Sequence, residues 1–426
     1  NVPLNFRVNN EKAGRIDIAS NNTLLGYQAG NTTTGGRNSA FGFQSLSNNT
    51  TGQVNTAIGH HALFSSSTGN SNTATGVYAL FSNTSGSSNT AFGVNALNQN
   101  STGWYNTALG MNALSSNTVG VYNIAGGFAS LYQNVNGDDN TANGRVSLFS
   151  NKAGSRGTAI GAYAMQYAND TSTPFTNSSV AVGYEALRGS TTASVNTGNS
   201  NTAVGYQTLT NNSSGNANTA IGYQTLLSNT TGNYNTAHGA LALNANTTGF
   251  YNTAVGVQAL WTNSTGQYNT ATGYASQLST TGSGNTSSGY QSLYLNTATN
   301  NNTAFGREAL YSNTTGNSNT AVGSQALYNN SGGHNNTAVG NNAGVNLTSG
   351  SYNIAIGWNA QVPVATNDNQ VRMGGTNITY AGIQVAWTVT SDRRWKSDIA
   401  ESDLGLDFIT RLKPVSYLRI NDENKK

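Results

Sequence analysis

Apolar and polar positions follow one fixed period along most of this chain. A phrase of Asn, Thr, Ala, an apolar residue and Gly returns with a seventeen-residue period, and its closing glycine marks twenty copies from Gly26 to Gly357. Most copies keep this period, as at Gly59, Gly76 and Gly93, whereas two steps are one residue shorter and two are five residues longer. Leu is most common at the fourth position after the glycine. This pattern predicts a tandem array in which each copy is one structural unit.

The length and composition of the repeat decide between a helical and a β-structured array. Seventeen residues cannot hold the two helices of known helical repeats, which need about 33 or more. Each copy also carries two glycines and several Asn, Ser and Thr, which are poor helix formers. The pattern therefore predicts an all-β parallel β-solenoid of about twenty coils. We expect two short strands per coil, at Thr-Ala-x and at the Ala-Leu pair, and a rod of roughly 90 Å.

Two apolar positions of the repeat are expected to form the core. The residue before the marker glycine is usually apolar, as at Ile58 and Phe92, and Leu63 and Leu97 represent the position four residues after it. Stacked in register, both positions should form apolar columns inside the coils. The glycines should supply positive φ or room for close backbone approach at the corners. Repeated Asn amides should form ladders from coil to coil.

The two long steps of the array predict protruding loops. Each inserts five residues, around 169–174 and around 191–194. Pro174 is the only proline of the array, which is typical of a bulge outside a ladder. Neutral insertion and a functional loop are both compatible with this pattern, since loops carry function more often than scaffold does.

Departures from the period at the two ends divide the chain into segments. Residues 1–20 form an N-terminal segment without the repeat, and residues 21–360 form the array. In 361–390 the repeat fades, and apolar residues alternate with period two within 378–389, which is typical of a strand with one buried face. We interpret 361–390 as an intertwined β neck between associated chains.

Composition excludes several classes of protein. Charged residues make up 8% of the chain, about a third of the usual share, which excludes a coiled coil and charge-rich disorder. No apolar run approaches the roughly 18 residues of a membrane span, so no membrane insertion is expected. A net charge of +3 without a basic cluster in the array argues against a nucleic-acid partner. Without cysteine no disulfide is possible. The chain begins at Asn1 without a signal peptide, and we expect a processed or partial product.

Few residues of the array suggest chemistry. Asp138 and Asp139 lie together in an expected turn and could act as glycosidase carboxylates only with a distant partner. No metal site and no cofactor are expected, because no suitably spaced acidic partners accompany the four histidines, His60, His61, His238 and His334.

Aromatic residues recur in register at three positions of the repeat. They follow the marker glycine, as at Tyr27, follow the Leu position, as at Phe64, or precede the opening Asn, as at Tyr105. Exposed columns could stack on sugar rings, whereas buried columns only pack. We favour structural stacking, with a platform for a glycan or host surface as the alternative.

The last 36 residues, 391–426, differ in composition and carry a specific resemblance. They hold 8 of the 18 basic and 7 of the 15 acidic side chains, and 405–414 predicts a short amphipathic helix. The phrase Ser-Asp-Arg-Arg-Trp-Lys-Ser-Asp-Ile at 391–399, followed by Leu-Gly-Leu-Asp-Phe-Ile at 404–409, resembles the opening of the intramolecular chaperone domain of phage tail spikes and endosialidases. The resemblance implies a trimeric, self-cleaving assembly chaperone, of which we expect only the start in this chain.

The repeat carries a second resemblance. Asn55-Thr56-Ala57-Ile58-Gly59 is similar to the Asn-Ser-Val-Ala-Ile-Gly phrase in the heads of trimeric autotransporter adhesins. This resemblance implies a left-handed parallel β-roll that packs as a homotrimer, although the coils of that family are shorter. Bacterial tail-fibre-type surface proteins combine similar repeats with the same chaperone, and the whole chain resembles them.

The resemblance to the chaperone implies one reaction. That family cleaves itself directly before its serine, with a lysine five residues later as the base. Ser391 and Lys396 match this spacing, which implies cleavage between Thr390 and Ser391. A lysine can act as a base at neutral pH only if its pKa is lowered, and Arg393 and Arg394 would lower it. The alternative is a chaperone segment that is retained uncut.

These features predict a structural fibre or shaft of an extracellular adhesin or phage-like tail fibre, at a cell surface or on a virion. The expected partners are copies of the same chain and a glycan or protein receptor on a host or cell surface. Self-cleavage is the only enzymatic activity expected. The alternative is a fibre that binds or degrades glycans. Ice binding is disfavoured, because it requires a Thr-x-Thr grid and the second Thr position is mostly apolar here.

Overall fold

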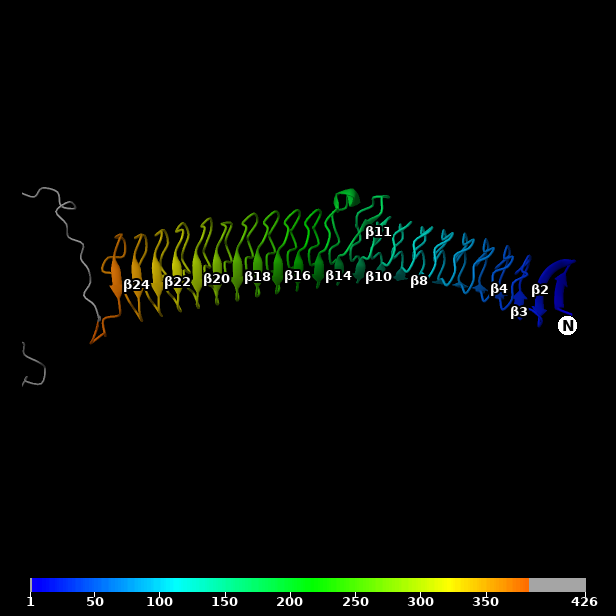
Figure 1. Ribbon diagram of the computed structural model, residues 1–426, viewed down its shortest axis with the longest axis horizontal. Helices are drawn as coiled ribbons and strands as arrows, with labels where there is room; N and C mark the ends of the chain where they lie inside the picture. Colours follow the sequence, from blue (N-terminus) through cyan, green and yellow to red (C-terminus); the bar gives the residue numbers. More distant parts are fainter. Residues whose placement is uncertain (1, 383–426) are drawn as a thin grey trace, which may run out of the picture. The chain divides into compact units, whose positions relative to one another are not determined.

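The computed structural model describes residues 2–382, which contain almost no helix. The chain divides into a first unit, residues 1–377, and a second unit, residues 378–426. The first unit is a long, gently curved rod of similar coils (Figure 1). Over this described stretch, no helix is long and apolar enough to cross a membrane.

Each coil contributes one short strand to a parallel ladder, and equivalent residues lie in register. Thr56, Ala57 and Ile58 of one strand lie opposite the equivalent residues of the next coil. The ladder belongs to a sheet of 23 strands, two of which form an N-terminal hairpin. Its strands are β3 (Asn22–Leu25), β4 (Ser39–Phe41), β5 (Thr56–Ile58), β6 (Thr73–Thr75), β7 (Thr90–Phe92), β8 (Thr107–Leu109), β9 (Ile124–Gly126), β10 (Thr141–Asn143), β12 (Thr158–Ile160), β14 (Val180–Val182), β15 (Thr202–Val204), β16 (Thr219–Ile221), β17 (Thr236–His238), β18 (Thr253–Val255), β19 (Thr270–Thr272), β20 (Thr286–Ser288), β21 (Thr303–Phe305), β22 (Thr320–Val322), β23 (Thr337–Val339), β24 (Ile354–Ile356) and β25 (Val371–Met373).

The parallel β-solenoid with a seventeen-residue repeat is confirmed, but the second strand expected in each coil is wrong. The Ala-Leu pairs form turns, in which His61 and Leu63 have φ of 54° and 52°. Because every second residue of this segment has a left-handed backbone conformation, the segment cannot form an extended strand. The amides of this segment still point along the rod, and the Leu63 N–H donates to the Ala79 carbonyl of the next coil at 2.9 Å. Hydrogen bonds between coils therefore continue through the turn.

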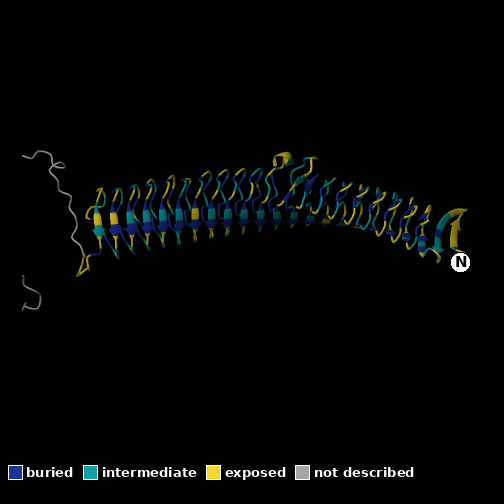
Figure 2. Ribbon diagram, in the orientation of Figure 1, coloured by how far each residue is buried: buried dark blue, intermediate teal, exposed yellow. Residues whose placement is uncertain are grey.

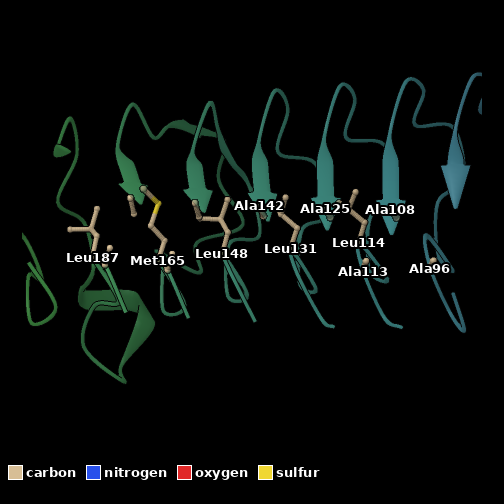
Figure 3. Packing of buried hydrophobic residues seen from close by; sticks show 14 of the residues in the cluster. Ala96, Ala108, Ala113, Leu114, Ala125, Leu131, Ala142, Leu148, Met165 and Leu187 are labelled. Carbon is tan, nitrogen blue, oxygen red and sulfur yellow. The ribbon is translucent and has the colours of Figure 1, made fainter. Parts of the chain in front are cut away.

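The core is a thin stack of small side chains. Ala57 and Leu63 are fully buried, and equivalent Ala and Leu residues stack from coil to coil (Figure 3). Buried residues form a band along the rod (Figure 2). The residue before the marker glycine points outward instead, with Ile58 42% and Phe92 61% exposed. Because side chains alternate along a strand, the buried Ala turns both of its neighbours outward. Of the two predicted columns, the Leu column is confirmed and the other is wrong.

Glycine and asparagine hold the corners of each coil, as the sequence predicted. Gly59 has φ of 132°, and a Cβ on it would lie 2.6 Å from a carbonyl oxygen of the next coil. A Cβ on Gly69 would lie 2.5 Å from another carbonyl oxygen. The buried Asn55 donates through Nδ2 to the Gly69 carbonyl at 2.8 Å, and its Oδ1 accepts from the Asn72 N–H at 2.9 Å. The Asn55 amide is thus paired through both its nitrogen and its oxygen, which avoids the cost of an unsatisfied polar group.

A β-hairpin covers the first coil of the array. β1 (Leu4–Val8) and β2 (Glu11–Asp17) pair antiparallel, and β2 pairs antiparallel with β3. The sequence predicts only that residues 1–20 lack the repeat. In the structure, this segment forms a hairpin that covers the edge of the ladder. An uncovered strand edge is a site of aggregation, so this hairpin acts as a cap.

The solenoid continues beyond residue 360. β25 pairs in parallel with β24, and Gly374, which follows Gly357 by one full repeat, has φ of 86°. This additional coil, about the twenty-first, uses part of the segment 361–390 that the sequence assigns to a neck. Residues 378–380, expected to be extended, are exposed and lie outside the strands. Residues 383–390 of the expected neck, and the whole segment 391–426, lie outside the described residues.

The two inserted segments protrude on one side of the rod, as predicted (Figure 1). In the first, β13 (Phe175–Thr176) pairs with β11 (Gly154–Ser155) of the preceding coil. The second contains a single 3-10 turn, η1 (Ala193–Val195). The main ladder passes both insertions without a break, because β12 pairs with β14 and β14 pairs with β15.

Candidate functional site

An apolar ridge runs along the marker glycines. We call it the glycine ridge and define it as the residues directly before and directly after the marker glycines from Gly26 to Gly374. Thirteen large apolar residues are exposed before the glycines and thirteen after them. Phe92 and Leu109 are ladder neighbours within it, and both side chains face solvent. The sequence analysis identified the aromatic residues after the glycines but assigned the row before them to the core, although the buried Ala at the centre of each strand indicates that this row points outward.

The aromatic residues in register stack on one another from coil to coil, and the alternative of a ligand platform stays open. Ring centroids are 5.3 Å apart for Tyr184 and Tyr206 within the ridge, and 5.0 Å apart for Tyr294 and Tyr311 after the Leu position. The column after the Leu position is half-buried, whereas the tyrosines of the ridge and those before the opening Asn are exposed. Only the exposed columns are accessible to a ligand.

An aromatic corner precedes β8, at the end of the strand opposite the ridge. Tyr105 and Tyr122 stack with centroids 5.2 Å apart and planes 10° apart, and Trp104 tilts against Tyr105 at 5.1 Å. Trp104 is 43% and Tyr105 51% exposed. The stack covers the face of Tyr105 that points toward Tyr122, so the opposite face of this ring is free.

A cleft lies in front of the free face of Tyr105. Ser88 lies one repeat before Tyr105 in the sequence. In the preceding coil it therefore occupies the repeat position that Tyr105 occupies in the following one. Its short side chain leaves a cleft of about 200 Å³, lined by Trp104, Tyr105 and four hydroxyl residues, Ser85, Ser87, Ser88 and Thr102. This volume is smaller than the roughly 300–1,000 Å³ of clefts for drug-sized ligands. It is the size of a single small ring.

The two insertions pack against the rod and leave little enclosed space. Asn196 holds the second insertion by donating to the Ser190 and Tyr167 carbonyls and accepting from the Ser190 N–H at 2.9 Å. The cavity between the insertions measures about 30 Å³, which is room for water but not for a larger ligand. A more open cleft of about 280 Å³ lies beside Pro174, with Asp138, Asp139 and Arg156 in its wall.

Two acidic residues of the array, Asp138 and Glu185, accept hydrogen bonds from neighbouring coils. Asp138 Oδ1 accepts from the Val121 N–H at 2.8 Å, as an Asn does at this position of other coils. Glu185 accepts from Gln207 at 2.8 Å, and its carboxylate raises the pKa of the neighbouring Tyr184. Asp138 therefore has a structural role, and nothing in its surroundings indicates a glycosidase pair.

The histidines His60 and His61 belong to an aromatic cluster. Phe43 stacks on His60 at 5.1 Å, and Tyr78 stacks on His61 at 5.4 Å. Burial, and then the charge of His60, lower the pKa of His61 below its usual value. Among residues 2–382, no three metal-ligating side chains come together.

The residues expected to carry self-cleavage, Thr390, Ser391 and Lys396, lie outside the described residues. Their roles stay a prediction from the resemblance. No protein-family model matches this chain, and no curated protein matches it. The glycine ridge and the cleft beside Tyr105 are two candidate surfaces among the described residues.

Proposed function

We propose that this protein is the shaft of an extracellular homotrimeric fibre, of the adhesin or phage-like tail-fibre type, whose copies pack along the glycine ridge. The observation that carries the proposal is the exposure of this apolar ridge along most of the array. The solenoid already has an internal core of Ala and Leu, so the outward faces of the ridge are not needed to complete the core of a single copy. A partner along the rod explains why apolar side chains recur there.

The area of the ridge is large enough to hold copies together. Its 26 exposed apolar residues present on the order of 1,500 Å² in total, if each shows about two-fifths of a large side chain. Monomeric proteins rarely expose an apolar patch larger than roughly 300–600 Å². A stable interface buries about 800 Å² from each partner. The total exceeds the size of such a patch, and half of it, about 750 Å² for each of two neighbouring copies, is close to the area that one partner buries in a stable interface.

The shape of the ridge favours a closed ring of copies. The marker glycine separates two exposed rows, as Gly93 separates Phe92 from Val94, and we take these rows as the two flanks of the ridge. A ridge with two apolar flanks can contact one copy on each side, which is a head-to-tail contact that closes by rotation. The resemblance to trimeric adhesin heads and to the chaperone supports three as the number of copies.

The remaining surface suits a spacer that presents another element. Charged residues are only 8% of the chain, and the four salt bridges of the described residues are scattered along the rod. We propose that residues 383–390 continue into a neck and that 391–426 begin the self-cleaving chaperone. Cleavage before Ser391 would release the folding aid after assembly. A glycan or protein receptor would bind to the assembled fibre.

Cysteine substitution tests this proposal, because the natural chain contains no cysteine. A thiol introduced by Phe92→Cys should form a disulfide between two copies under mild oxidation, since the ridges meet at the axis of the fibre. The product should be a covalent dimer on a denaturing gel, because the third thiol has no partner left. Thr231→Cys, about half a coil away from the ridge, is the matched control. Equal cross-linking at both sites, or none at Phe92, would contradict the proposal.

The alternative of a glycan-binding fibre also has a specific observation in its favour. Exposed Tyr columns precede several strands, and one of them ends in the cleft beside Tyr105. Binding at such a site is compatible with a shaft. Glycan degradation has no comparable support, since Asp138 is engaged in the ladder.

A further inference from the structure

The cleft beside Tyr105 contains the Ser87 backbone N–H, whose equivalent in most other coils donates a hydrogen bond to a side chain of the next coil. At this corner, a side-chain oxygen usually accepts from the backbone N–H of the preceding coil. Asn70 Oδ1 accepts from the Gln53 N–H at 2.8 Å, and Ser87 Oγ accepts from the Asn70 N–H at 3.0 Å. Trp104 occupies this position in the next coil and has no oxygen to offer. The Ser87 N–H therefore has no hydrogen-bond partner among the described residues.

A second aromatic corner of the same rod shows the cleft in a filled form. Phe250 occupies the same repeat position as Trp104, and Tyr251 follows it as Tyr105 follows Trp104. There the preceding coil carries Tyr234, which stacks on Tyr251 with centroids 4.9 Å apart. Tyr234 thus covers the ring face that Ser88 leaves free at Tyr105. The comparison indicates that the open cleft has the size and orientation of one flat ring.

We propose that this cleft binds a neutral hexopyranose, either as a single sugar or as one residue of a glycan. The apolar face of the sugar ring would lie on the free face of Tyr105, with one edge against Trp104. A ring hydroxyl would accept from the Ser87 N–H, and others would pair with the hydroxyls of Ser88 and Thr102. A pyranose combines an apolar face with polar edges, which is the combination that the lining offers.

The lining also argues for an uncharged ligand. It consists of two aromatic residues and four hydroxyl residues, with no Lys, Arg, Asp or Glu among them. An anionic sugar would lose hydration without gaining a cationic partner. A flat aromatic ligand would match the ring face but would leave the Ser87 N–H and the hydroxyls without acceptors. A neutral sugar satisfies both parts of the site.

This proposal goes beyond the shaft and does not depend on it. Tyr105 precedes β8, whereas the glycine ridge follows the strands at their other end, so assembly along the ridge leaves the cleft accessible. Loss of sugar binding would not change the mass of the fibre, and loss of assembly would not remove the cleft from one copy. The two proposals can therefore fail separately.

Saturation-transfer difference NMR on the full chain tests the site, with methyl β-D-galactopyranoside, methyl β-D-glucopyranoside and methyl α-D-mannopyranoside as probes. We expect transfer to the protons of the apolar ring face for at least one sugar, with a Kd on the order of 1 mM for a ligand of this size. Tyr105→Ala should weaken binding at least tenfold, because the stacking surface is removed.

Two further variants separate binding from folding. Ser88→Tyr should add a ring to the stack, as Tyr234 does in its coil, and should block binding at least tenfold while the melting temperature stays or rises. Ser88 has φ of 58° and Tyr105 has φ of 56°, so the backbone already accepts a tyrosine. Tyr122→Ala removes the ring that stacks on the other face of Tyr105, but Tyr122 does not line the cleft. This variant should therefore bind the sugar with a Kd within about threefold of wild type.

The outcomes are distinct. Binding lost in Tyr105→Ala and Ser88→Tyr but kept in Tyr122→Ala would support the site. Transfer that persists unchanged in Ser88→Tyr would place the sugar elsewhere and overturn the proposal. The absence of transfer to wild type for all three sugars, at about ten times the expected Kd, would overturn it as well.

Discussion

Replacement of Gly222 by alanine tests whether the marker glycines hold the corners of the solenoid. Gly222 has φ of 134°, a conformation that is almost confined to glycine. A Cβ on it would lie 2.9 Å from the carbonyl carbon and oxygen of Gly239. That carbonyl cannot move freely, because the Gly239 N–H donates to the Ile221 carbonyl at 2.9 Å. The ladder between the two coils must therefore open.

The expected loss follows from two costs. Backbone strain in this region costs about 1–3 kcal/mol, and inserting a methyl group into a packed site costs about 1–3 kcal/mol. We expect Gly222→Ala to destabilise its coil by about 2–5 kcal/mol, within the sum of these two ranges. Each coil contacts only its neighbours, so the effect should be local rather than spread along the rod.

Hydrogen exchange measured by mass spectrometry gives the required spatial resolution. Amides of residues 219–239 should exchange at least about 30-fold faster in Gly222→Ala, which corresponds to about 2 kcal/mol. Gly332→Ala is the matched control, because a Cβ there would meet only Thr315 Oγ1 at 3.3 Å. This control should exchange as wild type does. Equal and small effects of both substitutions would refute the assignment of marker glycines to strained corners.

Three further predictions concern the core, the ridge and the chaperone. Leu114→Ala, at a fully buried position, should cost about 2–5 kcal/mol in chemical denaturation, because it leaves a cavity in the Leu column. Phe92→Asp combined with Ile221→Asp should reduce the sedimenting mass to that of one chain, 44.2 kDa, because buried carboxylates repel one another; an unchanged mass would contradict the ridge interface. In a longer chain with a complete chaperone domain, the wild-type protein should be cleaved between Thr390 and Ser391, whereas Ser391→Ala should remain one band on a denaturing gel. N-terminal sequencing of the released fragment identifies the cleavage site. Cleavage that persists in Ser391→Ala would refute the role of the serine.

Much of the architecture could be predicted from the sequence, because the repeat fixes which residues lie opposite one another. The Leu column, the Asn55 ladder and the close approach at Gly59 all follow from spacing and residue type. Left-handed φ at Leu63 could not be predicted, since leucine shows no preference for it and coil-to-coil hydrogen bonds impose it. The outward direction of Ile58 was missed because hydrophobicity was given more weight than the alternation around Ala57.

Less of the candidate site could be predicted. The sequence places Trp104 and Tyr105 in register with other aromatic residues, but it does not show which ring faces are free. That depends on Ser88, one coil away, and on the backbone donor of Ser87. The hairpin of residues 4–17 was also missed, because residues 1–20 lack the periodic pattern from which the other elements were inferred. Local packing between coils decides both features.

The mass of the full chain in solution tests the proposed shaft most directly. Multi-angle light scattering across a micromolar concentration range measures it without a label or a substitution. A homotrimeric fibre predicts a constant mass of about three times 44.2 kDa. Burial of the glycine ridge should also keep an apolar dye from binding to the assembled protein. A monodisperse species of 44.2 kDa across that range, with the ridge accessible to the dye, would contradict the proposal and leave a monomeric solenoid.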